Sequence, residues 1–168
     1  MNRPSISPAV ILAQYNLYSI PVNVLALASE IGIRVFEEAL PEDISGILDL
    51  RNMPIIMVNQ DHVRNRQRFS IAHEIGHFLL HRPTGIHVDK RTYYRNSKSA
   101  EGLDDIEIEA NRFAAELLMP SDLVIREIEK YSDLIDSNDD VISVLADSFE
   151  VSATAMGFRI QNLGYHPF

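Results

Sequence analysis

Two histidines four residues apart, with a glutamate beside the first, are the residues of this chain best suited to chemistry. His73, Glu74 and His77 lie in a proline-free stretch with apolar residues on both sides, so a helix is expected there. Residues four apart share a helix face, so the two imidazoles can bind one metal ion. Glu74 is turned by about 100° from His73 and can act as a general base toward a water molecule without binding the metal. This pattern is typical of zinc hydrolases, and it predicts one catalytic Zn²⁺ ion.

A third histidine, His81, follows in the same stretch. It lies about 80° further around the helix than His73 and about 12 Å along its axis. We interpret it as a histidine near the negative end of the helix dipole, not as a metal ligand.

A catalytic zinc site needs a third protein ligand and an open position, and the chain has no cysteine to supply it. Residues 105–118 are expected to form a second helix. On one face of this helix lie Glu107, Asn111, Ala114 and Leu118. Small residues beside the acid allow close helix packing, and Asn111 can accept the outer N–H of a ligating histidine. Glu109 points about 200° away from Glu107, so we prefer Glu107 as the ligand, although both acids suit the first turn of a surface helix.

Together these segments resemble the ImmA/IrrE family of metallopeptidases, over about residues 20–165. The resemblance is carried by His73-Glu74-Ile75-Gly76-His77-Phe78-Leu79-Leu80-His81 and by Glu107-Ile108-Glu109-Ala110-Asn111-Arg112-Phe113-Ala114-Ala115-Glu116-Leu117-Leu118-Met119-Pro120. It implies zinc bound by His73, His77 and a glutamate of the second helix, with Glu74 as general base. The spacing of ligand and partner in related peptidases maps onto Glu107 and Asn111. The family also implies a substrate: helix-turn-helix repressors, often encoded beside the protease, whose cleavage releases mobile elements, toxin–antitoxin modules or stress genes.

Residues 83–104 show no clear period, and we expect a long loop between the two metal helices. Tyr93, Tyr94 and Arg95 in this loop are candidates for contacts with the oxyanion or the substrate, although loop tyrosines are more often packing or surface groups. The strand expected at residues 55–58 is a candidate for pairing with an extended substrate at a sheet edge.

The elements that must position these residues follow an α+β order: two helices, a small sheet, then helices. Helices are expected at about residues 9–16, 22–31, 62–81, 105–118, 121–131, 140–148 and 152–162, and strands at 33–37, 46–50 and 54–58. With the resemblance, this predicts a zincin-like minimal metallopeptidase with a small antiparallel sheet, a histidine helix, a second ligand helix and a C-terminal helix pair. We expect residues 1–131 to form the peptidase domain and residues 132–168 to pack on it.

Residues 141–164 have the pattern of a helix-turn-helix, which is a DNA-binding motif in many regulators. The second helix of this pair carries only Arg159 as a charge, and residues 121–168 hold three basic and nine acidic residues. That charge has the wrong sign for phosphate contacts, so we favour a packing role and do not expect direct DNA binding. The acidity instead suits a partner protein with a basic surface.

The length of 168 residues suits one domain, or one domain plus a small appendage, and the net charge is −9. Residues 61–98, which hold the histidine helix, are the exception, with eight basic and three acidic residues. The absence of cysteine excludes disulfides, thiolate metal sites and a cysteine nucleophile. No signal peptide and no long apolar run are evident, so we expect a cytoplasmic protein without a membrane partner.

The sequence supports hypotheses from different functional classes. The first is a gluzincin-like zinc endopeptidase that cleaves a helix-turn-helix repressor or antitoxin and so relieves repression. Glu74 favours this hypothesis, because a purely structural zinc site needs no base. The alternative is a non-proteolytic DNA- or partner-binding regulator on a peptidase fold, and a third, weaker possibility is a toxin or antitoxin that acts by binding alone.

Overall fold

The computed structural model describes residues 6–90, 101–132 and 138–165 of the chain. Its helices are α1 (Pro8–Gln14), α2 (Val24–Glu30), α3 (Arg64–Gly76), α4 (Glu101–Leu118), α5 (Ser121–Ser132), α6 (Asn138–Phe149) and α7 (Ala153–Asn162). Its strands are β1 (Arg34–Glu38), β2 (Ile44–Asp49), β3 (Ile55–Asn59) and β4 (Ile86–Lys90). A π-helical turn, η1 (His77–His81), continues α3. The expected α+β class is confirmed.

The sheet has the strand order β1-β3-β2-β4 and is mixed. The strands expected at residues 46–50 and 54–58 correspond to β2 and β3, which form a hairpin and pair antiparallel with Gly46 opposite Val58. β1, however, pairs parallel with β3, so the prediction of an antiparallel sheet was wrong for this strand. β3 therefore lies between two neighbours, and residues 55–58 do not form the sheet edge that the sequence suggested for a substrate.

The segment after the histidine helix also differs from the prediction. Residues 83–104 were expected to be a loop, but residues Ile86–Lys90 form β4, which pairs antiparallel with β2 and lies at the edge of the sheet. The strand alternates apolar and polar residues, a pattern too short to stand out in a polar stretch. Pairing with β2 decides the conformation of this segment, and such pairing is a long-range interaction.

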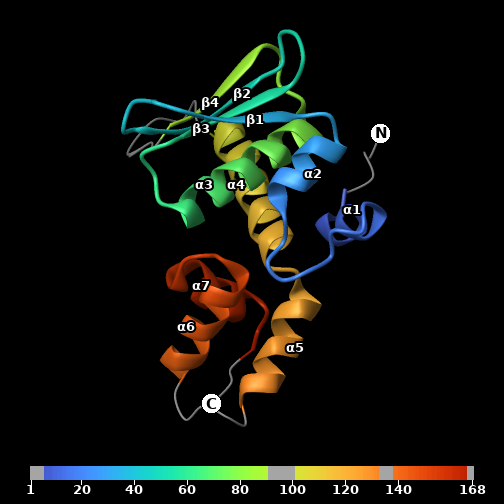
Figure 1. Ribbon diagram of the computed structural model, residues 1–168, viewed down its shortest axis with the longest axis vertical. Helices are drawn as coiled ribbons and strands as arrows, with labels where there is room; N and C mark the ends of the chain where they lie inside the picture. Colours follow the sequence, from blue (N-terminus) through green and yellow to red (C-terminus); the bar gives the residue numbers. More distant parts are fainter. Residues whose placement is uncertain (1–5, 91–100, 133–137, 166–168) are drawn as a thin grey trace.

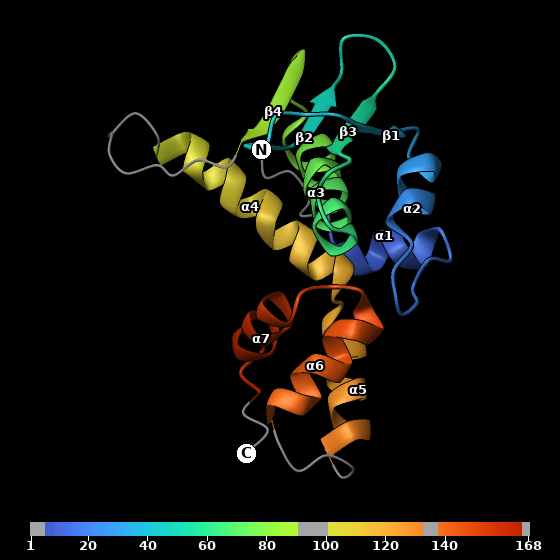
Figure 2. The same cartoon turned by 60° about the vertical axis from the view of Figure 1, so that its left-hand side comes forward.

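The sheet and the helices form two layers, with α2, α3 and α4 beneath the strands in Figure 1. α4 crosses α3 (Figure 2), and the two helices pack closely at Gly76, where a Cβ would lie 3.3 Å from the Cα of Ala110. The core contains apolar residues from the sheet and from helices throughout the chain. Its fully buried larger members are Phe149, Leu12, Leu27, Leu48, Ile56, Ile75, Leu117, Leu118, Met119, Ile128, Leu145 and Met156.

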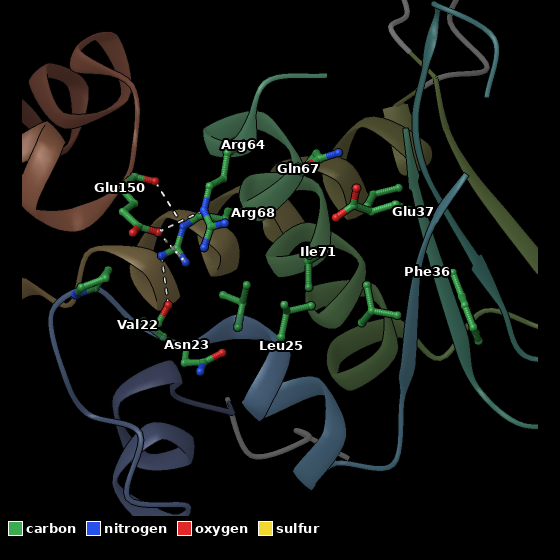
Figure 3. Close-up of a pocket in the computed structure, with 14 residues that line it drawn as sticks. Val22, Asn23, Leu25, Phe36, Glu37, Arg64, Gln67, Arg68, Ile71 and Glu150 are labelled. Carbon is green, nitrogen blue, oxygen red and sulfur yellow. Dashed lines mark hydrogen bonds and ion pairs between the residues drawn. The ribbon is translucent and has the colours of Figure 1, made fainter. Parts of the chain in front are cut away.

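A buried arginine of α3 connects the C-terminal helices to this core (Figure 3). The guanidinium of Arg68 donates to the carbonyl oxygens of Val22 at 2.9 Å and Glu150 at 3.2 Å, and it pairs with the Glu150 carboxylate at 3.2 Å. Arg64 also lines the hollow beside it, a cavity of about 670 Å³ between α2, α3 and β1. Arg68 thus links three parts of the chain that are distant in sequence.

The C-terminal pair α6 and α7 has the angle of a helix-turn-helix, with a bend of 106° between the two helices. Arg159 of α7 is buried, and it donates to the carbonyl oxygen of Met119 at 3.0 Å and to the hydroxyl of Ser121 at 2.9 Å. This arginine therefore holds α7 against the start of α5. Within the described ranges no single helix is long and apolar enough to span a membrane, and only the bent α6–α7 pair reaches that length and apolarity in combination.

Candidate metal centre

Helix α3 and the turn η1 bring the two motif histidines together. The Nε2 atoms of His73 and His77 lie 2.9 Å apart, and both side chains are buried. His77 is the first residue of the π-helical turn, in which the N–H of Arg82 donates to its carbonyl oxygen at 2.8 Å. π-helical turns are rare and are frequent at functional sites.

Helix α4 supplies a carboxylate to these histidines. The Glu107 oxygens lie 3.2 Å from Nε2 of His73 and 3.3 Å from Nε2 of His77. Glu109 lies outside this cluster, and its Oε2 is 3.8 Å from Nε2 of His81. The arrangement favours Glu107 over Glu109, as the helical period suggested, and it also leaves His81 out of the cluster.

Asn111 lies one turn after Glu107 and contacts the far side of the first histidine. Its Oδ1 is 3.0 Å from Nδ1 of His73. Since an amide oxygen only accepts hydrogen bonds, Nδ1 of His73 carries the proton and donates it, which leaves the lone pair of Nε2 free. A hydrogen-bonded outer nitrogen of this kind is the usual arrangement for a metal-binding histidine.

The spacing of these donor atoms fits a zinc ion. Ligand atoms of His73, His77 and Glu107 lie within 4.8 Å of one another. A tetrahedral ion with bonds of about 2.0–2.1 Å separates its ligand atoms by roughly 3.3 Å. The separations of 2.9, 3.2 and 3.3 Å among these three side chains are close to that value. Two imidazoles and one carboxylate are also a donor set that zinc accepts in hydrolases, with one position left for water.

Glu74 is fully buried beside this cluster, and its two oxygens differ in their surroundings. Oε2 lies 3.2 Å from Nδ1 of His87, whereas Oε1 has no hydrogen-bond partner among the described residues. A Cβ on Gly46 of β2 would lie only 3.2 Å from Oε1, so the glycine avoids a close contact with this oxygen. A carboxylate oxygen without a hydrogen-bond partner is available to accept a proton from water.

His87 is a site residue that the sequence analysis missed. It lies on β4, and its Nε2 is 3.1 Å from Glu107 while its ring centroid is 3.9 Å from that of His77. Asp89, two residues further along β4, belongs with His73 and Glu74 to a second group of possible ligand atoms within 4.8 Å. The alternation of His87 and Asp89 with Ile86 and Val88 was the available signal, but alternation usually places the polar residues on the solvent side.

The electrostatics of the cluster favour a bound cation. Burial alone would raise the pKa of Glu107, but contacts with His73, His77 and His87 lower it far below its usual range. Burial favours the neutral ring of His87, yet its contacts with Glu107 and Glu74 outweigh burial and raise its pKa to about 10. Burial likewise opposes protonation of His73, and the contact with Glu107 and the charge of Glu74 nevertheless raise its pKa. These carboxylates thus stabilise positive charge on the groups around them.

The three residues expected to contact an oxyanion, Tyr93, Tyr94 and Arg95, lie outside the described residues. Their roles remain predictions from the sequence.

Comparison with known proteins matches residues 28–161 to the Peptidase_M78 family, described as the IrrE N-terminal-like domain. The chain belongs to the Peptidase_M78 family. This confirms the expected membership of the ImmA/IrrE group and supports a metallopeptidase-type function. A family of metallopeptidases also implies a metal, for which the cluster on α3 and α4 has suitable donors.

A relative of this Peptidase_M78 chain occurs in a bacterial virus. Over 100 residues the chain is 34% identical to a protein of Bacillus phage phi105 named uncharacterized immunity region protein 2. The match covers 58% of this chain and 59% of the phage protein, so the chain spans less than two thirds of that protein's length.

Proposed function

We propose that this protein is a zinc-dependent endopeptidase of the gluzincin type that cleaves a helix-turn-helix repressor or antitoxin and thereby relieves repression. The observation that carries the proposal is the cluster of His73, His77 and Glu107 beside the buried carboxylate of Glu74. Three ligands and an adjacent base are what a catalytic zinc site requires, whereas a structural site is usually closed by four ligands.

The chain's own residues divide the work of peptide hydrolysis. When bound, zinc polarises the scissile carbonyl and makes water a stronger acid. Oε1 of Glu74 accepts the proton of the attacking water, and the same carboxyl group later donates it to the leaving amine. Because Asn111 accepts the N–H of Nδ1, the neutral ring of His73 carries its lone pair on Nε2, on the side of the cluster.

An extended substrate has a suitable place along β4. This strand is at the sheet edge, carries His87 toward the cluster, and pairs only with β2 among the described strands. A peptide that adds to the free edge of β4 would run past the metal centre and gain main-chain hydrogen bonds. The loop residues Tyr93, Tyr94 and Arg95 follow β4 directly in the chain and remain our candidates for contacts with substrate or oxyanion.

The name of the phage relative supports a regulatory substrate. A relative named as an immunity region protein is consistent with a role in repressor regulation, and a repressor partner would place the reaction in the cytoplasm. The acidic segment 121–168 suits a partner with a basic, DNA-binding surface. Direct DNA reading by α7 is disfavoured, because its Arg159 is buried and hydrogen-bonded within the protein.

Substitution of the base tests this function. Glu74→Gln keeps the size of the side chain but removes the proton acceptor, so we expect cleavage to fall by about 100- to 10,000-fold. Zinc content should stay at the wild-type level, because Glu74 is not a proposed ligand. The measurement is co-expression with any helix-turn-helix protein that is encoded beside the gene, followed by mass spectrometry of its fragments and metal analysis of the purified protein.

The same experiment separates the alternative regulator from the peptidase. Cleavage that persists in Glu74→Gln would show that this residue is not the base. If the partner stays intact with both the wild type and Glu74→Gln, and the wild type binds duplex DNA tightly and specifically, the non-proteolytic regulator would be favoured. A DNA-binding titration at several salt concentrations provides that second measurement.

A further inference from the structure

His87 lies where β4, α3 and α4 meet. Its Nδ1 is 3.2 Å from Oε2 of Glu74 on α3, and its Nε2 is 3.1 Å from Oε1 of Glu107 on α4. One imidazole therefore contacts both the proposed base and the proposed third ligand. Neither the family membership nor the motif spacing assigns a role to this residue.

The position of His87 is determined by the sheet. His87 is paired in register with Leu48 of β2, and Leu48 is fully buried. Paired residues on neighbouring strands point to the same face, so His87 points into the protein with Leu48. Its ring also lies 3.9 Å from that of His77, and its side chain is only 21% exposed. The sheet thus fixes the position of the His87 imidazole, and this ring can hold two carboxylates in place by hydrogen bonds.

Both carboxylates need such a support, because a glutamate side chain has several rotamers and two equivalent oxygens. The contact with His87 occupies Oε2 of Glu74, which leaves Oε1 as the unbonded oxygen beside Gly46. The contact with Glu107 holds a carboxylate that is half-exposed, at 39%, in reach of the two ligating histidines.

We propose that His87 is a positioning residue that holds Glu107 toward the metal ion and Glu74 toward the attacking water. The inference rests on the proposed peptidase function and extends it to the edge strand. Because β4 also offers the free edge for an extended substrate, the strand that receives the peptide is the one that aligns both carboxylates. Strand β4 would then position the metal ligand Glu107, the base Glu74 and the substrate.

Two variants of His87 test this role, and His81 offers a matched control. His81→Ala removes a neighbouring histidine whose Nε2 is 3.8 Å from Glu109 and whose ring centroid is 5.5 Å from that of His77, but which contacts neither Glu74 nor Glu107 through a hydrogen bond or ion pair among the described residues. His87→Ala removes both contacts, and His87→Gln keeps an amide that can donate to one carboxylate. The measurements are zinc affinity by competition with a chelator, the absorption spectrum of the Co²⁺-loaded protein, and kcat and KM at saturating zinc.

Loss of an outer hydrogen-bond partner typically weakens metal binding by about 10- to 100-fold, and we expect this loss in His87→Ala. The visible Co²⁺ bands should shift while keeping the intensity of the same coordination number, because Glu107 changes orientation but stays bound. The kcat should fall with little change in KM, because Glu74 is misaligned. His87→Gln should recover part of each loss, and His81→Ala should resemble the wild type.

Zinc affinity and Co²⁺ spectrum equal to the wild type in His87→Ala would overturn the proposal. A Co²⁺ spectrum with the intensity change of a lost ligand would also overturn it, since His87 would then bind the metal itself. If His87→Ala does not fold, His87→Gln carries the test: weaker zinc binding with shifted bands supports the proposal, and wild-type values refute it. Failure of the wild-type protein to bind either metal would instead refute the peptidase function on which the inference rests.

Discussion

The chemistry of the site depends on single atoms of a few side chains. Asn111 lies 3.0 Å from Nδ1 of His73, and the cluster places an oxygen of Glu107 within 3.3 Å of Nε2 of each motif histidine. Glu74 has one oxygen held by His87 and one unbonded. At this scale the arrangement separates two tasks for two carboxylates: Glu107 lies among the metal donors, and Glu74 lies beside them.

The choice between the two glutamates of α4 is a prediction at this scale. Glu107→Ala removes one of the three proposed ligands, and we expect zinc affinity to fall by more than the roughly 100-fold that loss of an outer partner causes. Glu109→Ala, a matched control two residues away, should bind zinc like the wild type. Chelator competition on both purified variants measures the difference, and the reverse ranking would mean that Glu109 is the ligand.

At the scale of elements, the site depends on the close approach of two helices. A Cβ on Gly76 of α3 would lie 3.2 Å from the ring of Phe113 and 3.3 Å from the backbone of Ala110. Backbone atoms of a helix do not move aside as a flexible side chain does. Glycine at this position therefore lets α4 bring Glu107 to the histidines of α3.

Gly76→Ala tests this contact. Overpacking of this kind typically costs about 1–3 kcal/mol, so we expect the free energy of unfolding to fall and zinc binding to weaken. Gly157→Ala in helix α7 is the control, since the nearest atom to its added Cβ would be Cδ1 of Ile142, at 3.9 Å. There alanine should stabilise the protein by about 0.5–1 kcal/mol, because glycine is unfavourable inside helices. Urea unfolding compares the two, and equal effects would refute close packing at Gly76.

At the scale of the whole molecule, buried arginines connect the C-terminal helices to the rest. Arg68 reaches Val22 and Glu150, and Arg159 reaches Met119 and Ser121. We propose on this basis that residues 132–168 pack as one unit on a peptidase domain of residues 1–131. The pair α6–α7 then has a structural role that is independent of its helix-turn-helix pattern.

Arg68→Met tests the connection at this scale. Methionine keeps much of the volume but leaves the carbonyl oxygens of Val22 and Glu150 without their donor, so we expect a loss of about 2–4 kcal/mol in the free energy of unfolding. Arg64→Met is the control, because the Arg64 side chain is 79% exposed and its pair with Glu150 is long, at 3.7 Å. It should change stability little. A loss with Arg64→Met as large as with Arg68→Met would contradict the proposed connection.

Features that depend on local spacing were predicted well from the sequence. The helical period placed His73 and His77 on one face, put Asn111 one turn from Glu107, and separated Glu109 from them. These relations hold within one helix, where the distance between side chains follows from their separation along the chain. The order of the strands could not be predicted in this way. The residue pattern of β1 would be the same whichever edge of the β2–β3 hairpin it paired with.

By itself the sequence determined the candidate metal-binding histidines, the glutamate beside them and the helices that carry the proposed ligands, because each depends on neighbours within one or two turns. The tertiary structure alone decided that β4 forms the edge beside the site and that His87 contacts both Glu74 and Glu107. It also placed Gly46 against the Glu74 carboxylate. These contacts join residues from different elements, and only the pairing of strands and the packing of helices on the sheet bring such residues together.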